Sequence, residues 1–184
     1  MNYKERFDYF VKDYFENSVS KTLKEVLKSL IIVFGDTNDL LYLKNWNVEF
    51  TYKCTTGKNW FGNEKWSKAT PLWLHKICGL YGDKTSIVSI FKWRQKVDEL
   101  QYFPEYGKVY PVIMTRILQL QGLEERNSNT YSRYIYIHWT PNIWYWKAGN
   151  LKKTYGCISL LPLQMLELFN LVKKETETYV YILN

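Results

Sequence analysis

Apolar residues recur at steps of three and four over roughly the first thirty positions of the chain, a spacing that predicts helix. Phe7, Val11, Val19, Leu23 and Leu30 are among the residues that carry it. Because an α-helix turns every 3.6 residues, such a stripe covers one helical face. Residues 1–29 are therefore expected to form one or two amphipathic helices, which would pack on the following domain or dock on a partner.

After Leu30 the pattern changes to short runs of strand type, separated by turn residues. These runs are 30–34, 39–43, 48–54, 70–77, 87–91, 111–120, 134–138 and 178–183. Residues 55–70 are polar and contain glycine, so they are expected to form a loop. The final run is expected to close the sheet as its last strand.

The segment 161–174 returns to helical spacing through its leucines, Phe169 and Val172. Pro162 suits the first turn of a helix, and the lysines at 173–174 suit its end. The sequence thus predicts a mostly β domain over residues 30–184 with one good helix near its C-terminal end. A helical extension, residues 1–29, precedes it.

The composition is that of a folded domain, with 46% hydrophobic and 23% charged residues spread along the chain. The net charge of +7 would suit an anionic partner such as nucleic acid, a membrane surface or a wall polymer. Since the lysines occur singly or in pairs and no nucleic-acid-binding motif is recognisable, nucleic acid is not expected as a partner. The sequence also predicts neither a transmembrane segment nor the apolar core of a signal peptide.

Two residues stand out as candidates for chemistry: His138, at the end of a predicted strand, and Cys157, in a turn beside Gly156. A thiol becomes a strong nucleophile when an imidazole takes its proton and backbone amides stabilise the thiolate. Cys157 is therefore the candidate nucleophile and His138 its base. Their spacing alone does not distinguish this pair from a buried cysteine and a hydrogen-bonded core histidine.

The remaining cysteines and the second histidine carry no comparable signal. The chain has three cysteines without CxxC spacing, which argues against a zinc site and against a full disulfide framework. Cys54, His75 and Cys78 are expected to fill the core, and no metal site is expected.

The segments around His138 and Cys157 resemble the catalytic domain of the L,D-transpeptidase family (YkuD type), which cross-links bacterial cell walls. The family signature is Ile-His-Gly-Thr followed by Ser-His-Gly-Cys-Ile-Arg. Here these stand as Ile137-His138-Trp139-Thr140 and Thr154-Tyr155-Gly156-Cys157-Ile158-Ser159. Further likeness at 70–77, 115–124 and 131–138 extends the resemblance over roughly residues 30–184. It implies a β-sandwich with a helix after the nucleophile.

The resemblance also implies roles for individual residues. Cys157 would attack the carbonyl of the third residue of a peptidoglycan tetrapeptide stem and expel the terminal D-alanine, without any cofactor, and an amine of a neighbouring stem would resolve the acyl-enzyme. His138 would be oriented by the backbone carbonyl of Trp139, and amides from Tyr155 and Gly156 to Cys157 would bind the oxyanion. The implied substrate-binding residues are Thr140, Ser159 and Arg133. The implied location is the cell wall or periplasm.

Three residues depart from the family pattern: Tyr155 replaces a histidine, Ser159 an arginine and Trp139 a glycine. An indole beside the base would fill the path by which a stem peptide enters. Two alternatives therefore stand beside transpeptidation. One is a cysteine carboxypeptidase, in which water resolves the same acyl-enzyme, and the other is a catalytically impaired protein that binds the cell wall.

Five further tryptophans also stand where related sequences have glycine: Trp46, Trp60, Trp66, Trp73 and Trp93. The chain has 8 tryptophans and only 9 glycines, about 5% glycine where about 7% is usual. One hypothesis is that UGA codons read as glycine by the source organism were translated here as tryptophan, at these positions and at Trp139. The other is that the tryptophans are genuine core or sugar-stacking residues, as Trp144 and Trp146 would be on either hypothesis.

Overall fold

The computed structural model describes residues 3–10, 26–102, 112–141 and 153–184. The helices in these ranges are α1 (Tyr3–Phe10), the 3-10 helix η2 (Glu125–Thr130) and α3 (Pro162–Val172). Part of the helix expected over residues 1–29 is thus present as α1, while residues 11–25 and Trp144 and Trp146 lie outside the described residues. No helix in the described ranges is long and apolar enough to span a membrane.

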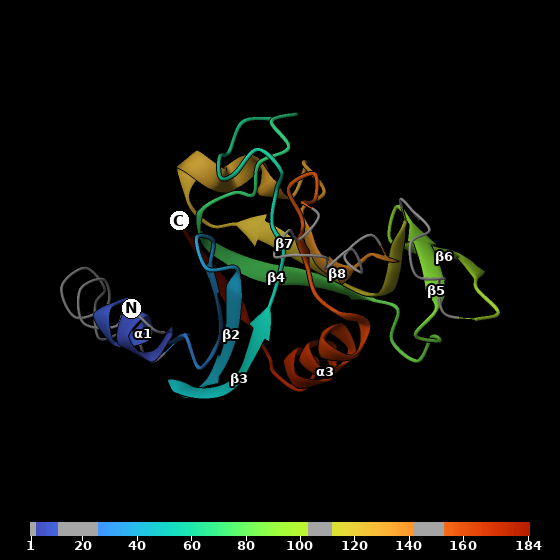
Figure 1. Cartoon of the computed structure of the whole chain (residues 1–184), viewed down its shortest axis with the longest axis horizontal. Coiled ribbons are helices and arrows are strands. Elements are labelled where there is room, and N and C mark those ends of the chain that lie inside the picture. The colour runs from blue at the N-terminus through green and yellow to red at the C-terminus, as the bar shows by residue number, and fades with distance from the viewer. Residues whose placement is uncertain (1–2, 11–25, 103–111, 142–152) are drawn as a thin grey trace.

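Ten strands form one sheet in the described ranges (Figure 1). They are β1 (Ser29–Phe34), β2 (Asp39–Lys44), β3 (Asn47–Lys53), β4 (Trp73–Tyr81), β5 (Ser89–Lys92), β6 (Gln95–Glu99), β7 (Ile113–Gly122), β8 (Tyr136–Trp139), β9 (Ile158–Ser159) and β10 (Tyr179–Leu183). The fold is mostly β, as expected. The strands are hydrogen-bonded in the order β3-β2-β1-β10-β4-β7-β5-β6, and β8 joins β7 to β9.

The position of the last strand differs from the sequence prediction. β10 does not close the sheet but lies inside it, parallel to β1 and antiparallel to β4. Val180 and Ile182 are fully buried there, because a strand with neighbours on both sides is covered along both edges. The prediction of a strand was confirmed and its place at the end of the sheet was wrong.

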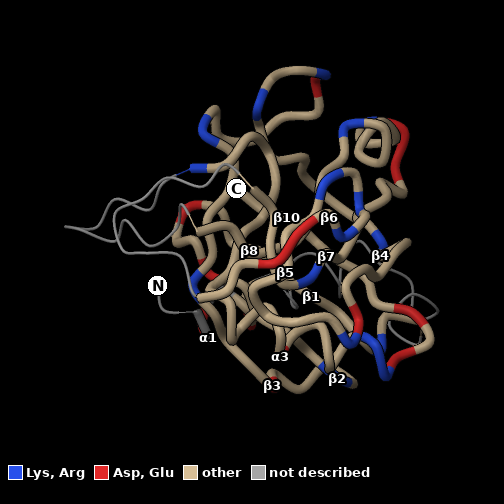
Figure 2. The backbone as a smooth tube through the Cα atoms, turned by 90° about the vertical axis from the view of Figure 1, so that its right-hand side faces the viewer, with Lys and Arg blue, Asp and Glu red and all other residues tan. Residues whose placement is uncertain are grey.

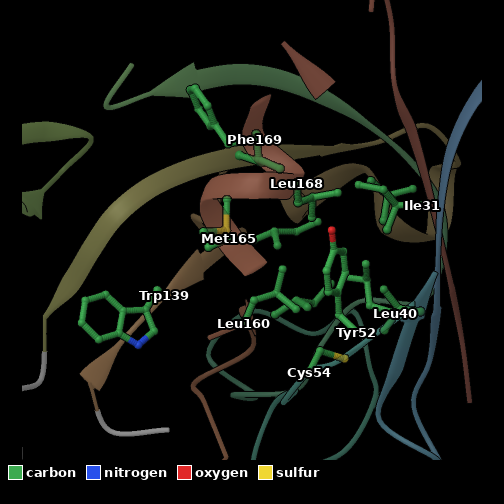
Figure 3. Packing of buried hydrophobic residues seen from close by; sticks show 14 of the residues in the cluster. Ile31, Leu40, Tyr52, Cys54, Trp139, Leu160, Met165, Leu168 and Phe169 are labelled. Carbon is green, nitrogen blue, oxygen red and sulfur yellow. The ribbon is translucent and has the colours of Figure 1, made fainter. Parts of the chain in front are cut away.

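The main core lies between the sheet and α3, which packs against β7 and β8 (Figures 1 and 3). Pro162 occupies the first turn of α3, where its missing N–H costs no hydrogen bond. The face that α3 buries carries Met165, Leu168 and Phe169, each 0% exposed, at the three- and four-residue steps of a helix. The helix predicted over 161–174 is therefore confirmed, and it covers the strands that position the site.

Shortening one side chain of this helix face should destabilise the whole domain. Leu168→Ala is expected to lower the free energy of unfolding by about 2–5 kcal/mol, because it removes fully buried methyl groups and leaves a cavity. Leu163→Ala, on the same helix but 70% exposed, should change it by less than about 0.5 kcal/mol. Urea unfolding of both variants measures the difference, and equal losses would contradict this packing.

A second, smaller core covers the opposite side of β1 and β2. Leu30, Ile32 and Leu41 belong to it, and Phe7 of α1 packs against it. The N-terminal helix therefore contacts the β domain through Phe7. Charged residues of both signs are dispersed over strands, loops and turns (Figure 2).

Candidate functional site

The pairing of β8 and β9 places His138 and Cys157 on the same face of the sheet. Ile137 lies opposite Ile158 and His138 opposite Ser159 in parallel register. Because side chains alternate between the faces of a strand, the two isoleucines point into the main core, to which both belong. His138 and Cys157, each one residue away from an isoleucine, point to the other face, which we call the thiol face.

The packing of Cys157 agrees with this register. Cys157 lies against a cluster formed by Phe91, Ile117 and Tyr136, separate from the main core. Two residues along a strand span about 6.6 Å and adjacent strands lie about 4.8 Å apart, so the Cα atoms of Cys157 and His138 are separated by roughly 8 Å. Two side chains can bridge such a separation.

The ring of His138 is held in one tautomer by the backbone. Its Nδ1 lies 2.9 Å from the carbonyl oxygen of Trp139, and since a carbonyl can only accept, Nδ1 carries the proton. Nε2 is then the basic nitrogen. Burial lowers the pKa of His138 to about 4, so the ring is neutral at physiological pH and able to accept a proton.

The backbone carbonyl of His138 is itself fixed by two donors. The Leu160 amide donates to it at 3.0 Å, and Ser159 Oγ donates to it at 3.0 Å. Ser159 is 0% exposed, so its hydroxyl contacts the base segment and not the solvent-accessible pocket. The structure thus places the Ser159 hydroxyl against the carbonyl of His138, whereas the resemblance implied a contact with substrate.

The thiol of Cys157 is half-buried and donates to the backbone carbonyl of Tyr134, with Sγ and O 3.6 Å apart. Burial raises the pKa of Cys157 to about 11, while a backbone hydrogen bond from Tyr136 and the charge of Arg133 act in the opposite direction. Without substrate the pair is therefore a neutral thiol and a neutral imidazole. Tyr134 and Tyr136 contact the sulfur through their backbones, which no pattern of side-chain types could indicate.

One hydroxyl, that of Thr154, makes two hydrogen bonds within the turn before Cys157. Thr154 Oγ1 donates to the Cys157 carbonyl at 2.5 Å and accepts from the Gly156 amide at 3.1 Å. Gly156 has φ +116°, and a Cβ there would lie 2.8 Å from the carbonyl oxygen of Ala69, so only glycine fits. The Gly156 amide, a predicted oxyanion donor, is thus engaged within the turn in this state, and Tyr155 is exposed beside it.

The segment from Thr55 to Lys58 runs alongside this turn and β9. Thr55 and Ser159 exchange two backbone hydrogen bonds of 2.9 Å each. Thr154 likewise bonds to the loop on both sides, accepting from Lys58 and donating to Thr56, at 2.9 Å each. The residues predicted as a loop between strands therefore brace the nucleophile segment.

A pocket of about 370 Å³ lies next to residues near Cys157, and neither Cys157 nor His138 is part of its lining. The lining residues are Lys65, Trp66, Lys68, Ser132, Arg133, Tyr134, Ile135 and Tyr155. They include three cations and no acidic residue. Arg133 donates to the backbone carbonyls of Gly62 at 3.0 Å and Ala69 at 2.6 Å, and Lys68 lies 5.1 Å from the centre of the Tyr155 ring. The pocket is therefore positively charged next to Cys157.

Arg133, one of the predicted substrate contacts, lies on the pocket wall. Thr140, the other predicted substrate contact, is half-buried directly after β8, and the pocket lining does not include it. Of the three predicted substrate-binding residues, the structure thus brings only Arg133 into the described pocket.

Trp139 does not occupy the entry path that its sequence position suggested. It is 0% exposed and belongs to the main core with Ile137 and Ile158, near Leu160 (Figure 3). The expectation that its indole blocks the site beside the base was wrong, because strand alternation directs Trp139 to the face opposite His138. Within the described pocket, the tryptophan at the rim is Trp66, which is 84% exposed.

The other reactive residues have ordinary surroundings. Cys54 is 1% exposed, and burial raises its pKa to about 12. His75 is 0% exposed, with Nδ1 2.9 Å from the Trp73 carbonyl oxygen and Nε2 3.2 Å from Thr130 Oγ1. Both fill the core, as expected, whereas Cys78 is exposed because it points outward from β4.

Comparisons with known proteins bear on the family and the fold. The model of the YkuD family, described as the L,D-transpeptidase catalytic domain, matches residues 28–182. No curated protein matches the chain.

Several solved structures share the fold at low sequence identity. An L,D-transpeptidase from Xylanimonas cellulosilytica is 11% identical with a TM-score of 0.52, covering 85% of this chain and 61% of that one. An Enterococcus faecium L,D-transpeptidase is 15% identical with a TM-score of 0.50, covering 85% and 50% respectively. One from Mycobacterium smegmatis is 13% identical with a TM-score of 0.50, covering 85% and 59%. The chain thus spans between half and about three fifths of these proteins.

Proposed function

Because this chain belongs to the YkuD family of L,D-transpeptidase catalytic domains, we propose that it is a cysteine acyltransferase acting on peptidoglycan stem peptides in the cell wall or periplasm. The observation that carries the proposal is the register of β8 and β9, which puts Cys157 and a neutral, backbone-oriented His138 on one face. Neither residue needs a cofactor for acyl transfer.

The proposed reaction starts with rotation of the Cys157 side chain from the Tyr134 carbonyl toward Nε2 of His138. Nε2 takes the thiol proton as Sγ attacks the carbonyl carbon of the third stem residue. The tetrahedral intermediate collapses by breaking the bond to the terminal D-alanine, whose amine leaves with the proton from His138. A thioester on Cys157 remains.

The second half of the reaction reverses these roles. His138 takes a proton from the side-chain amine of a neighbouring stem as that nitrogen attacks the thioester. The new amide forms a 3-3 cross-link, or exchanges the terminal residue when the attacking amine belongs to a free D-amino acid. The thiol regains its proton from His138, so the cycle leaves both groups as it found them.

The positive pocket supports an anionic acyl donor, since stem peptides carry free carboxylates. Lys68 and Arg133 lie on the pocket wall, and the coulombic effect of Arg133 reaches the Cys157 sulfur. These two cations would hold a substrate carboxylate and so replace the family arginine, at whose position this chain has Ser159. Arg133 also ties down the 62–69 loop, so Lys68 is the better residue for a test of substrate binding.

Lys68→Ala is expected to raise KM for a tetrapeptide donor about three- to tenfold with a smaller change in kcat, because an exposed charge-assisted contact contributes about 1 kcal/mol. Steady-state kinetics at low and high salt would measure it, and the wild-type advantage should shrink at high salt. Lys92→Ala, an exposed lysine at the end of β5, serves as the matched control. Identical kinetics for all three proteins would exclude Lys68 from substrate binding.

One product analysis tests the proposed activity and separates it from the carboxypeptidase alternative. The protein is incubated with a disaccharide-tetrapeptide, and the products are weighed by mass spectrometry. Transpeptidation gives a cross-linked dimer and free D-alanine, whereas hydrolysis gives the tripeptide. Recovery of the unchanged tetrapeptide, together with retained binding to cell walls, would identify the impaired wall-binding protein instead.

A further inference from the structure

Five of the six tryptophans in the described ranges have a left-handed backbone: Trp46 (φ 68°), Trp60 (φ 61°), Trp66 (φ 68°), Trp73 (φ 74°) and Trp93 (φ 52°). Seven other non-glycine residues in the rest of the described chain do so, in line with the few per cent expected for side chains with a Cβ. Since glycine is the residue that adopts this conformation without a steric penalty, we infer that the functional protein carries glycine at these five positions.

Two of the five lie in hairpin turns whose geometry specifies glycine. Asn45 and Trp46 connect β2 to β3 between the paired residues Lys44 and Asn47, with φ values of 47° and 68°. Positive φ at both central residues defines a type I′ turn, for which Asn-Gly is the favoured pair. Another turn type here would require a shift in the register between β2 and β3.

The same argument applies at the β5–β6 hairpin, which is remote from the first. Trp93 and Arg94 form its two-residue turn between the paired residues Lys92 and Gln95, with φ values of 52° and 71°. Two independent hairpins thus place tryptophan where positive φ is obligatory.

Three of the five side chains also lack the burial that is usual for tryptophan. Trp60, Trp66 and Trp93 are 70%, 84% and 65% exposed. Tryptophan stabilises a fold mainly through the large apolar area that its indole buries. Trp139 differs on both counts, since it is fully buried and its φ is not positive in this structure. The inference from backbone geometry therefore covers five positions and leaves Trp139 to the sequence resemblance.

Glycine at position 66 would alter the proposed active site. Trp66 lines the pocket together with Lys65, Lys68 and Arg133, so its loss would widen the opening beside Cys157 while keeping all three cations. The inference itself does not depend on the proposed chemistry, because it rests on φ angles at five separate positions.

Paired substitutions test the inference without using catalysis. Trp60, Trp66 and Trp93 are each replaced by glycine and by alanine in the full chain, and unfolding in urea is measured. Both replacements remove the same indole, so their difference reports backbone conformation alone. Glycine should make the folding equilibrium about 5- to 30-fold more favourable than alanine does at each site. At Leu163 in α3, the matched control, alanine should be the more stabilising residue.

The protein isolated from its own source gives the second measurement. Peptide mass spectrometry across residues 44–47 and 92–95 should find glycine in place of Trp46 and Trp93, and the gene should carry UGA at the five positions. Tryptophan in those peptides, or alanine variants as stable as the glycine variants, would overturn the inference. Since neither measurement involves acyl transfer, an inactive protein would leave this result intact.

Discussion

Replacing Cys157 with alanine is expected to reduce acyl transfer from a tetrapeptide donor at least about 10⁴-fold, down to the level that binding alone supports. The reason is that the other two thiols have different surroundings: Cys54 is buried in the main core and Cys78 is exposed on β4. Product formation followed by mass spectrometry measures the loss. The urea midpoint of the variant should stay close to that of the wild type.

Cys78→Ala is the matched control for this experiment. It removes an exposed thiol from the same domain and should leave the rate within about twofold, since surface substitutions away from special features have small effects. If Cys78→Ala were as inactive as Cys157→Ala, or if Cys157→Ala kept its activity, the nucleophile would have been assigned to the wrong residue.

Replacing His138 with asparagine is expected to slow the formation of the acyl-enzyme about 10²- to 10⁴-fold, the usual contribution of a general base. With the pKa of His138 lowered to about 4, the ring remains in its proton-accepting form well below neutral pH. kcat/KM should therefore be flat from about pH 5 upward and fall below that as His138 takes up a proton. Pre-steady-state acylation rates across this range measure both effects.

The fall of kcat/KM at low pH must be separated from a loss of folded protein at low pH. His75 and His138 both have a pKa lowered to about 4 by burial, whereas the unfolded chain binds these protons near pH 6.5. The unfolded state therefore binds more protons than the folded state between about pH 4 and 6.5. The free energy of unfolding rises with pH across that window, and this stabilisation is lost as the pH falls through it. A rate that follows the folded fraction alone, in wild type and His138→Asn alike, would contradict a catalytic role for His138.

The fold could be predicted from the sequence wherever burial left a local pattern. The continuous apolar run of β1 comes from burial on both faces, against the main core and the second core. The 3.6-residue spacing of α3 comes from burial of one face, so residues 30–34 and 161–174 were placed correctly. β6 was missed because all five of its residues are exposed, and an exposed strand has no apolar alternation. The interior position of β10 depends on pairing with β1 and β4, which are distant in sequence.

The sequence likewise indicated some features of the candidate site and not others. His138 and Cys157 could be proposed from the sequence because their residue types and neighbouring motif are distinctive. The position of Trp139 was missed because the predicted strand ended at His138, whereas β8 continues through Trp139 and so turns its side chain to the opposite face. The contact of Ser159 with the His138 carbonyl depends on the pairing of β8 with β9. Contacts to Cys157 from the backbones of Tyr134 and Tyr136 leave no trace in residue type, and the bracing of the turn by Thr55 and Thr56 required the three-dimensional path of the loop.

The most direct test of the account is to locate the covalent intermediate. The protein is mixed with a carbapenem, which acylates an activated serine or cysteine, and is then digested and mapped by mass spectrometry. We expect a single adduct on Cys157, absent from Cys157→Ala and formed at least about 100-fold more slowly in His138→Asn. No adduct on Cys157, or one that forms equally fast without His138, would show that these two residues do not act as a nucleophile and its base.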